Sequence, residues 1–393
     1  MSGALLTINA GSSSLKASLF DIDAGAPTPI FKGEVEGVGT APRFTVRDHA
    51  GEVVLDRSWP DADTPFDVVL ETVIAWAESR RGEADLKAVG HRVVHGGRDY
   101  VHPRRVTPQL LDALDRLTPL APLHQPHNLA PIRAIAAARP DLPQVACFDT
   151  AFHATMPTVA KRFALPRAYE DAGVWRYGFH GLSYEHIAWR LAAEAPDLAA
   201  GRVIAAHLGA GASLCAMAGG RSLDTTMGFT AVDGLVMGTR CGELDPGVVL
   251  YMQREDGLSV DQVETVLNRK SGLLGVSGIS SDMRALLASD SPRAAQAIEL
   301  FVYRITRDIG GLTSVLGGLD GLVFTAGIGA KSPPIRQMVC ERLAWLGLIL
   351  DPEANAAGTP VISAPESLVE VRVIPADEEE TIARHTLANL TDG

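Results

Sequence analysis

Two segments of the same design, about two hundred residues apart, constrain the fold of this chain most strongly. In each segment a short apolar run leads into a turn of small residues rich in glycine, and a second apolar run follows. This order predicts two strands joined by a tight turn. Two such hairpins indicate a duplicated domain, in which each half places one turn on a shared cleft. The predicted strands are residues 4–9, 15–20, 202–208 and 214–218.

The rest of the sequence alternates helical and strand patterns, which is typical of an α/β protein. A chain of 393 residues exceeds the roughly 250–300 residues at which a single core stops growing, so two domains are expected. We expect a first domain over residues 1–150, to which the terminal helix at about 377–393 can return, and a second domain over 151–376. The expected helices are 67–80, 108–116, 183–194 with Ser183 as N-cap, 260–268, 281–288, 292–316 and 377–390, and the expected later strands are 86–89, 144–148, 321–326 and 369–375.

The net charge of the chain limits the classes of partner that it is expected to bind. A formal net charge of −12 argues against nucleic acid or an anionic membrane as partner, because both are bound through basic surfaces. The first ten residues lack the positive segment of a secretory signal, and the longest uncharged stretch, 203–220, is interrupted by glycines. The four cysteines show no metal-ligand spacing, which is expected for reduced thiols of a cytoplasmic protein.

The first turn, NAGSSSLK from Asn9, suits a phosphate group. Small residues let the backbone approach the phosphate, Lys16 supplies a cation, and Ser12 and Ser14 supply hydroxyls. Asn9, at the strand end, can orient a metal ion or a phosphate. An ordinary hairpin turn is an equally good interpretation of this segment alone. The segment is not a Walker A loop, because no Gly-Lys-Ser/Thr has the necessary spacing.

Two further glycine-rich segments fit phosphates. The second turn, residues 209–213, can hold phosphates in the same way as the first. The segment GIGAK at residues 327–331 follows a strand and is similar to half of a dinucleotide fingerprint, but it lacks the third glycine. We therefore interpret it as a nucleotide-side loop that leads into a helix.

Isolated basic residues lie beside glycines at the predicted ends of elements. Arg92 follows the strand 86–89, Arg240 lies among glycines, and His180 lies in a tight turn before a helix. Each of these residue types is usually structural when it stands alone, whereas the three together indicate a convergent anion site. Asp149 follows a buried strand, where it can either reach a metal ion or cap a turn.

Together these residues resemble the acetate kinases of the acetokinase family, within the superfamily of sugar kinases, actin and heat-shock ATPases. The resemblance covers nearly the whole chain in one order. The matching segments are NAGSSSLK from Asn9, HRVVHGG from His91, APLH ending at His124, FDTAFHATMP from Phe148, RYGFHGLSY from Arg176, HLGAGAS from His207, LDTTMGFT from Leu223, GLVMGTRCGELDPG from Gly234 and KSGLLGVSGISSDMR from Lys270.

The resemblance implies two duplicated actin-like ATPase domains of mixed sheets flanked by helices, with the active site in the interdomain cleft. It implies a reversible, direct in-line transfer of the γ-phosphoryl group of ATP to acetate, with Mg²⁺ or Mn²⁺ as cofactor. It also implies a cytoplasmic homodimer that associates through the second domain. The first domain would serve the acyl group and phosphate, and the second would bind the nucleotide.

Roles for individual residues follow from the same resemblance. Arg92 and Arg240 would clamp the carboxylate and the transferring phosphoryl group, His180 would stabilise that group with His124 nearby, and Asp149 would be the essential acid. Ser14 and Lys16 would meet phosphate, and Asn9 with Glu378 would hold the magnesium shell. The acetate methyl pocket would be Val94, Leu123 and Phe179. The ATP site would be His207, Leu208, Gly209, Ala210, Gly211, Asp282, Met283, Arg284, Gly327, Ile328, Gly329, Ala330 and Lys331.

The chain departs from the usual family pattern at several positions. Gln125 stands where Asn usually follows the histidine, and Ala231 stands where a proline usually narrows the acyl pocket. Ala210 replaces an Asn, and Ala330 and Lys331 replace Glu and Asn. These differences leave the nucleotide preference and the length of the acyl chain open.

Alternatives to acetate kinase also stay open. A propionate or broader short-chain acyl kinase would use the same machinery, and Ala231 gives it a roomier pocket. A nucleotide-driven binding module of the actin or heat-shock type would share the two turns but not the cluster of Arg92, His180 and Arg240, and a dehydrogenase has the weakest support. The segment DEEE from Asp377 to Glu380 also fits a helix capping box, which is an alternative to a metal role for Glu378.

Charge determines what the mechanism needs. A carboxylate is ionised at neutral pH, so it requires no general base to act as a nucleophile. The difficulty is to bring this anion up to a polyanionic phosphate chain, which is a task of positioning and electrostatic stabilisation. Arginine suits both anions because its guanidinium binds them bidentately. On this basis Asp149 is a magnesium-shell or orienting group rather than a proton acceptor.

Overall fold

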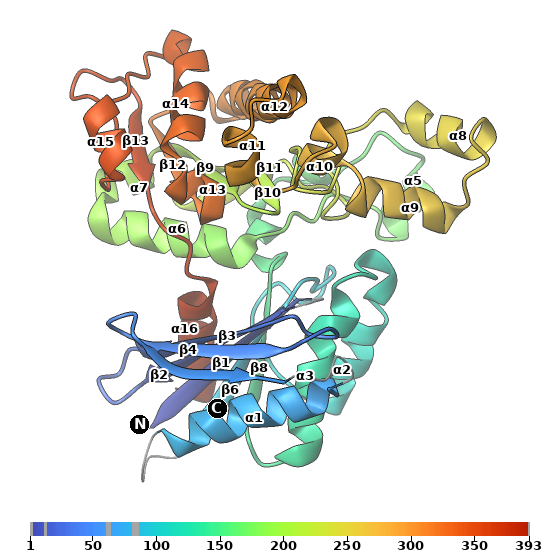
Figure 1. Ribbon diagram of the computed structural model, residues 1–393, viewed down its shortest axis with the longest axis vertical. Helices are drawn as coiled ribbons and strands as arrows, with labels where there is room; N and C mark the ends of the chain where they lie inside the picture. The colour runs from blue at the N-terminus through green and yellow to red at the C-terminus, as the bar shows by residue number, and fades with distance from the viewer. Residues whose placement is uncertain (1–2, 12–13, 60–63, 81–85, 392–393) are drawn as a thin grey trace. The chain divides into compact units, whose positions relative to one another are not determined.

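The protein, described here as a computed structural model, divides into two compact units (Figure 1). The structure describes residues 3–11, 14–59, 64–80 and 86–391. The first unit comprises residues 1–151 and 377–393, and the second comprises 152–376. Each unit has a mixed β-sheet flanked by helices, which confirms the α/β class.

The first unit is built on a sheet in the order β5-β4-β3-β2-β1-β6-β8-β7. Strands β1 to β5 are antiparallel neighbours, whereas β1, β6 and β8 run parallel. All five residues of β8 are buried, as expected for a parallel strand covered on both faces. The strands are β1 Ala4–Ala10, β2 Ser14–Asp21, β3 Thr28–Glu36, β4 Arg43–Asp48, β5 Val53–Ser58, β6 Leu86–Val93, β7 Arg104–Arg105 and β8 Gln144–Phe148.

Helices cover both faces of this sheet because the side chains of β1 alternate between the faces. Leu6 and Ile8 pack against α1 and α3, and Leu5 packs against α16. α16 can lie close to β6 because Gly90 has no side chain, and a Cβ there would collide with Thr386. The helices are α1 Phe66–Ser79, α2 Pro108–Asp115, α3 Gln125–Ala138 and α16 Glu378–Thr391. The last part of the chain therefore completes the first unit.

The second unit has a sheet in the order β11-β10-β9-β12-β13. Its antiparallel hairpin β9–β10 is joined to the parallel strands β12 and β13, as β1–β2 is joined to β6 and β8 in the first unit. This shared order supports the predicted duplication. The strands are β9 Arg202–Leu208, β10 Ala212–Ala218, β11 Arg221–Thr225, β12 Gly321–Thr325 and β13 Glu370–Val373.

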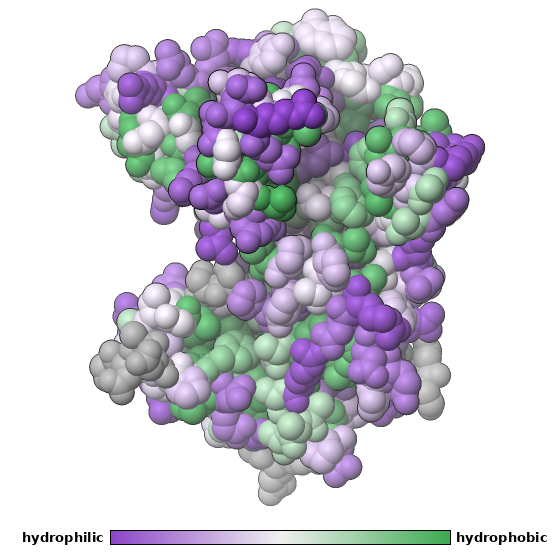
Figure 2. All heavy atoms as spheres, turned by 90° about the vertical axis from the view of Figure 1, so that its right-hand side faces the viewer, coloured by the Kyte–Doolittle hydropathy of each residue, from purple (hydrophilic) through white to green (hydrophobic). Residues whose placement is uncertain are grey.

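Helices α6 and α7 pack against one side of the second sheet through apolar residues such as Ile187 and Leu191, and α12 contacts β9, β10 and β11. Figure 2 shows the face that carries α8 and α9, where hydrophobic residues lie among hydrophilic ones. Among the described residues no helix is long and apolar enough to cross a membrane. The remaining helices are α4 Thr158–Lys161, α5 Arg167–Asp171, α6 Gly181–Glu194, α7 Pro196–Ala200, α8 Pro246–Arg254, α9 Val260–Arg269, α10 Gly272–Ser277, α11 Met283–Leu287, α12 Pro292–Leu316, α13 Ala326–Lys331, α14 Pro333–Arg342 and α15 Pro352–Ala357.

Three local predictions are wrong. Strand β6 continues to Val93, so Arg92 lies inside the strand rather than after it. Helix α6 begins at Gly181 with His180 as the N-cap residue, and Ser183 is buried inside the helix. Residues 327–331 belong to helix α13, which starts directly after β12, so they are not a loop.

Candidate active site

A cluster of polar side chains around Arg92 lies in the first unit. Arg92 donates from Nε and Nη2 to Oδ2 of Asp149, at 2.9 and 2.5 Å, and from Nη1 to Oδ1 of Asn9 at 3.1 Å. Asn9 is on β1, Arg92 on β6, and Asp149 directly follows β8. These three strands are parallel neighbours, so their carboxyl ends bring the side chains together.

Glu378 joins this cluster from the first turn of α16. Nδ2 of Asn9 donates to Oε2 of Glu378 at 3.1 Å, and Nε of Arg92 lies 3.7 Å from the same oxygen. The helix is capped by Asp377, whose Oδ1 accepts from the backbone N–H of Glu380 at 2.9 Å. Capping by Asp377 therefore leaves Glu378 available to the cluster, and the two interpretations of this acidic segment are compatible.

The electrostatics of the cluster centre on Asp149, which is fully buried. Burial raises the pKa of its carboxyl to about 6; the Arg92 guanidinium opposes this shift, and the charge of Glu378 adds to it. Burial works against the charge of Arg92, but Asp149 and Glu378 raise the pKa of Arg92 above its usual value. Oδ1 of Asp149 is buried and has no hydrogen-bond partner among the described residues.

These residues fit a magnesium ion. The unpartnered Oδ1 of Asp149, the Glu378 carboxylate and the Asn9 amide oxygen are oxygen donors of the kind that Mg²⁺ prefers. The described part of the chain has no group of three or more His, Cys, Asp or Glu that could hold a metal ion alone. Mg²⁺ is usually held by one or two carboxylates together with water and substrate phosphates, which agrees with this donor set.

The first hairpin turn lies beside this cluster in the sheet register. Lys16 on β2 pairs with Asn9 on β1, and its side chain is exposed. The backbone N–H of Gly11 donates to the carbonyl oxygen of Ser14 and closes the turn. Ser12 lies outside the described residues. Lys16 and Ser14 are therefore placed at the turn where phosphate binding was predicted.

Sequence reasoning missed Asn128, a buried residue of α3 that braces the same region. Its Oδ1 accepts from the backbone N–H of Val94, and its Nδ2 donates to the carbonyl oxygen of Ala10. It thereby ties the end of β1 to the segment after β6. A buried amide in a helix gives no sequence signal that distinguishes it from an exposed one. Leu123 and His124, which directly precede α3, are partly buried.

Gln125, which departs from the family pattern, is completely buried at the start of α3. Its Nε2 donates to the carbonyl oxygens of His95 and Leu114, at 3.1 Å each. The longer side chain therefore joins α2 to the segment that follows β6.

In the second unit, two histidines stack on each other. The rings of His180 and His207 are 4.1 Å apart with an interplanar angle of 15°. Nδ1 of His180 is 2.9 Å from Oγ of Ser213, and Nδ1 of His207 is 2.9 Å from Oγ of Ser183. His180 is the N-cap residue of α6 and bonds Ser213 on β10, whereas His207 on β9 bonds Ser183 on α6. The two hydrogen bonds therefore join α6 to the β9–β10 hairpin.

Gly211, in the turn between β9 and β10, borders a space where two cationic or donor groups converge. A Cβ at this position would lie 3.1 Å from Nε2 of His180 and 3.7 Å from Nη2 of Arg240. Arg240 is held by a hydrogen bond from Nη1 to the carbonyl oxygen of Ala231 at 2.8 Å. The missing side chain of Gly211 therefore leaves room for an anion beside both groups.

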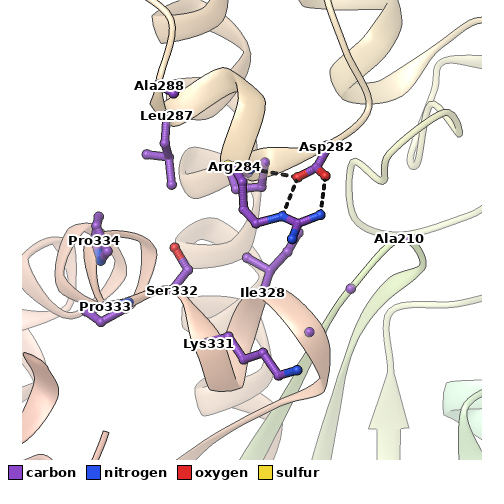
Figure 3. Close-up of a pocket in the computed structure, with 13 residues that line it drawn as sticks. Ala210, Asp282, Arg284, Leu287, Ala288, Ile328, Lys331, Ser332, Pro333 and Pro334 are labelled. Carbon is purple, nitrogen blue, oxygen red and sulfur yellow. Dashed lines mark hydrogen bonds and ion pairs between the residues drawn. The ribbon is translucent and has the colours of Figure 1, made fainter. Parts of the chain in front are cut away.

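A pocket of about 640 Å³ lies beside this turn in the second unit (Figure 3). Arg284 forms a two-pronged ion pair with Asp282 at one wall, and Lys331 extends from α13 at another. Much of the remaining lining is apolar, as suits a base and a sugar. Its lining residues include Gly209, Ala210, Asp282, Met283, Arg284, Leu287, Ala288, Gly327, Ile328, Lys331, Ser332, Pro333 and Pro334.

Five residues predicted for the ATP site are not among the lining residues of this pocket: His207, Leu208, Gly211, Gly329 and Ala330. Leu208 and Gly329 are both buried, and a Cβ added at Gly329 would lie 3.6 Å from Cβ of Leu208. The carbonyl oxygens of Gly329 and Ala330 accept from Nη1 of Arg336, which is completely buried. Arg336 thereby fixes α13 through its backbone.

Phe179, predicted for the methyl pocket, belongs to the second unit and is buried beside His153. Its carbonyl oxygen accepts from Nε2 of His153, whose Nδ1 lies 2.9 Å from Oγ of Ser222. Burial is the main cause that lowers the pKa of His153 to about 4, and nearby Lys161 adds to the effect.

We expect the second unit to lose stability in acid because of His153. Its pKa is lowered on folding, so the unfolded chain binds more protons between about pH 6.5 and 4, and the free energy of unfolding falls as the pH falls. The loss from this residue should be about 3 kcal/mol at pH 4. Thermal or urea unfolding at pH 7 and pH 4.5 should show a smaller acid loss in His153→Gln than in the unaltered chain. Equal losses in the two proteins would contradict the assignment.

Comparisons with known proteins show the family of this chain. Residues 4–384 match the model of the acetokinase family. The chain is 54% identical to an acetate kinase of Rhodopseudomonas palustris, with all of both chains covered, and 50% identical to an acetate kinase of Rhizobium meliloti, with 98% of each covered.

Solved structures of related kinases are similar to this chain over nearly its whole length. The acetate kinase of Porphyromonas gingivalis has a TM-score of 0.86 at 36% identity, covering 99% of this chain and all of its own. A propionate kinase from Francisella tularensis has a TM-score of 0.90 at 33% identity, with 98% of each chain covered. The whole length of the fold is therefore shared, and this chain belongs to the acetokinase family.

Proposed function

We propose that this chain is an acetate kinase that transfers the γ-phosphoryl group of ATP reversibly to acetate. The observation that carries the proposal is the turn 209–211. Gly209 and Ala210 line the nucleotide pocket, and Gly211 borders the space where His180 and Arg240 converge. One turn thus joins a nucleotide pocket to groups that can stabilise charge on a transferring phosphoryl group.

The residues of the first unit would serve the acetate and the metal. Arg92 carries a permanent positive charge and would bind the acetate carboxylate, which needs no activation by a base. Asp149, Glu378 and Asn9 would hold Mg²⁺, and Lys16 with Ser14 would contact phosphate. A bound Mg²⁺ would neutralise charge on the β- and γ-phosphates of ATP. On this proposal, the phosphoryl group passes from ATP to acetate by direct in-line transfer.

The second unit would supply the nucleotide site and the remaining cationic group. Asp282, Met283, Arg284, Gly327, Ile328 and Lys331 line the pocket that would hold the adenosine part of ATP. Arg240 and His180 would bind the equatorial oxygens of the phosphoryl group, and His207 would keep the ring of His180 in place by stacking. Val94, Leu123, His124 and Phe179 would enclose the acetate.

A propionate kinase is the second candidate, and Ala231 is the observation that favours it. The carbonyl oxygen of Ala231 accepts from Arg240, so the backbone at this position is held near the proposed site while the side chain is small. A methyl group in place of a proline ring leaves room for a longer acyl chain. The similarity to the propionate kinase of Francisella tularensis is compatible with this alternative.

An acyl phosphate assay tests the function directly. The protein is incubated with ATP and Mg²⁺ and with acetate, propionate or butyrate, and the acyl phosphate is trapped with hydroxylamine. We expect strong product with acetate and little with butyrate. Equal or greater product with the longer acids would assign a broader short-chain acyl kinase. No product with any acid, alongside measurable ATP binding, would contradict the enzyme proposal and favour a nucleotide-driven binding module.

We further propose a cytoplasmic homodimer. None of the four cysteines is in a disulfide bond, which suits a reducing compartment. Exposed apolar side chains on α8 and at the start of α9, among them Leu250, Tyr251 and Val260, offer a surface for a second copy in the second unit. Sedimentation velocity of the unaltered chain would show a monomer if this assignment is wrong.

A further inference from the structure

A chain of three side chains runs from the interior of the second unit to His180. The hydroxyl of Tyr184 hydrogen-bonds Oγ of Ser213, and Oγ of Ser213 hydrogen-bonds Nδ1 of His180 at 2.9 Å. Tyr184 and Ser213 are completely buried, whereas His180 is only partly buried. The hydroxyl of Ser213 therefore meets Nδ1 of His180, and the hydroxyl of Tyr184 supports that of Ser213 from behind. Nε2 is the other ring nitrogen of His180, and it lies nearest to the Cβ position of Gly211.

The direction of these hydrogen bonds is determined by Tyr184. Burial raises the pKa of its phenol well above the usual value, so the phenol keeps its hydrogen. The hydroxyl of Tyr184 is completely buried, and among the described hydrogen bonds its partner is Oγ of Ser213. A buried O–H group without an acceptor is unfavourable, so the phenol hydrogen is directed to Ser213.

A serine hydroxyl has one hydrogen to donate. Since Oγ of Ser213 accepts from Tyr184, its hydrogen is free to be donated to Nδ1 of His180. An imidazole whose Nδ1 accepts a hydrogen bond carries its proton on Nε2. In that tautomer the N–H group of His180 points to the space beside Gly211, where an oxygen anion needs a donor.

We propose that Tyr184 and Ser213 are positioning residues that hold His180 in the Nε2–H tautomer for phosphoryl transfer. The proposal rests on the proposed function, because the phosphoryl group is what the Nε2–H would bind. In the other tautomer the lone pair of Nε2 would face the phosphoryl oxygens and repel them. The hydroxyl pair thus determines whether His180 attracts or repels the transferring group.

The backbone of His180 explains why such a support is needed. His180 has a φ of 58°, in the left-handed region that residues with a side chain seldom adopt. It is the N-cap residue of α6, but its side chain makes no capping hydrogen bond. The hydrogen bond to Ser213 and the stacking with His207 both act on the orientation of the ring.

Steady-state kinetics of two variants test the proposal. Tyr184→Phe and Ser213→Ala should each lower kcat about tenfold, the rate equivalent of one hydrogen bond, with the KM of ATP nearly unchanged. Ser213→Thr keeps a hydroxyl and should recover most of the rate. Tyr177→Phe is a matched control, because it removes a tyrosine hydroxyl that donates to the Gly173 carbonyl oxygen rather than to Ser213, and it should keep kcat. A loss in Tyr177→Phe equal to that in Tyr184→Phe would contradict the proposal.

Nitrogen NMR of the ¹⁵N-histidine-labelled protein without substrates tests the tautomer independently of turnover. The His180 signals are assigned by their absence from His180→Gln. We expect an unprotonated Nδ1 and a protonated Nε2 in the unaltered chain, and a mixture of tautomers in Ser213→Ala. Ser183→Ala, which removes the hydroxyl bound to His207 instead, should leave the His180 signals unchanged. A protonated Nδ1 in the unaltered chain, or an unchanged tautomer in Ser213→Ala, would overturn the proposal even if the chain is an acetate kinase. The expected spectra without any acyl kinase activity would contradict the proposed function and leave the tautomer assignment intact.

Discussion

Replacement of Gly211 by alanine is expected to lower kcat/KM for both acetate and ATP by about 100-fold, the size of the loss caused by misplacing reacting groups by about 1 Å. The added Cβ would occupy the space where Nε2 of His180 and Nη2 of Arg240 converge. The backbone of Gly211 is not in the left-handed region, so alanine imposes no backbone strain. Unfolding experiments should therefore show a change of less than about 1 kcal/mol while the activity is lost.

Gly311→Ala is the matched control for this variant. Gly311 lies inside α12, and nothing lies within 4 Å of an added Cβ apart from the helix itself. Alanine there should keep the activity and raise the stability by about 0.5–1 kcal/mol, because glycine is unfavourable inside a helix. Full activity of Gly211→Ala would show that no substrate atom enters the space beside His180 and Arg240, and would remove the main support for the phosphoryl site.

Asp149→Asn is expected to lower kcat by about 100- to 1000-fold and to raise the Mg²⁺ concentration needed for half-maximal activity. Asparagine keeps an oxygen that can accept from Arg92, as Oδ2 of Asp149 does. It removes the negative charge and places an amide nitrogen at the position of the unpartnered Oδ1. A neutral amide binds Mg²⁺ less strongly than a carboxylate. The measurement is a titration of activity with Mg²⁺ at saturating ATP and acetate.

Asp320→Asn is a suitable control, because Asp320 forms a two-pronged ion pair with Arg202 at the surface of the second unit, away from the residues of the proposed site. It should leave the Mg²⁺ titration unchanged. An unchanged Mg²⁺ dependence in Asp149→Asn would contradict the metal role of Asp149.

The pH profile of the unaltered chain gives a second measurement on the same carboxyl. Without bound Mg²⁺ the pKa of Asp149 is raised to about 6, so at limiting Mg²⁺ the carboxyl takes up a proton as the pH falls through that value, and activity should fall with it. Because Glu378 contributes to this raised pKa, Glu378→Gln should move the acidic limb to lower pH. The sign for stability is the reverse: a carboxyl with a raised pKa in the folded state gains stability as the pH falls from 6 toward 4.

Local pattern predicted much of the fold. Glycine turns between apolar runs identified both hairpins, and the buried strand before Asp149 was recognised from its continuous apolar residues. The long helix 292–316 was predicted to the residue, because its apolar periodicity and the proline at its start are both strong local signals. Strands β3 to β5 were not predicted, because much of their length is exposed and their apolar pattern is weak.

The candidate site depends on contacts that the sequence does not reveal directly. Asn9 and Glu378 are separated by 369 positions, and their proximity was anticipated only through the family resemblance. Two hydrogen bonds of the site, His180 with Ser213 and His207 with Ser183, join different elements. The spacing of residues within a single element therefore does not predict them. Ser183 was predicted as an N-cap from its type alone, whereas the left-handed backbone of His180 starts the helix three residues earlier.

The return of α16 to the first sheet has a consequence for biosynthesis. The ribosome must synthesise the whole second unit, more than 200 residues, before it reaches the helix that covers β1 and β6 and supplies Glu378. At about 5–20 residues per second this interval lasts roughly 10–45 s. During that time the apolar face formed by Leu5, Phe20 and Ala88 has no covering helix from its own chain. The nascent first unit should therefore be a client of chaperones that bind exposed apolar surface, until the final helix is released from the ribosome.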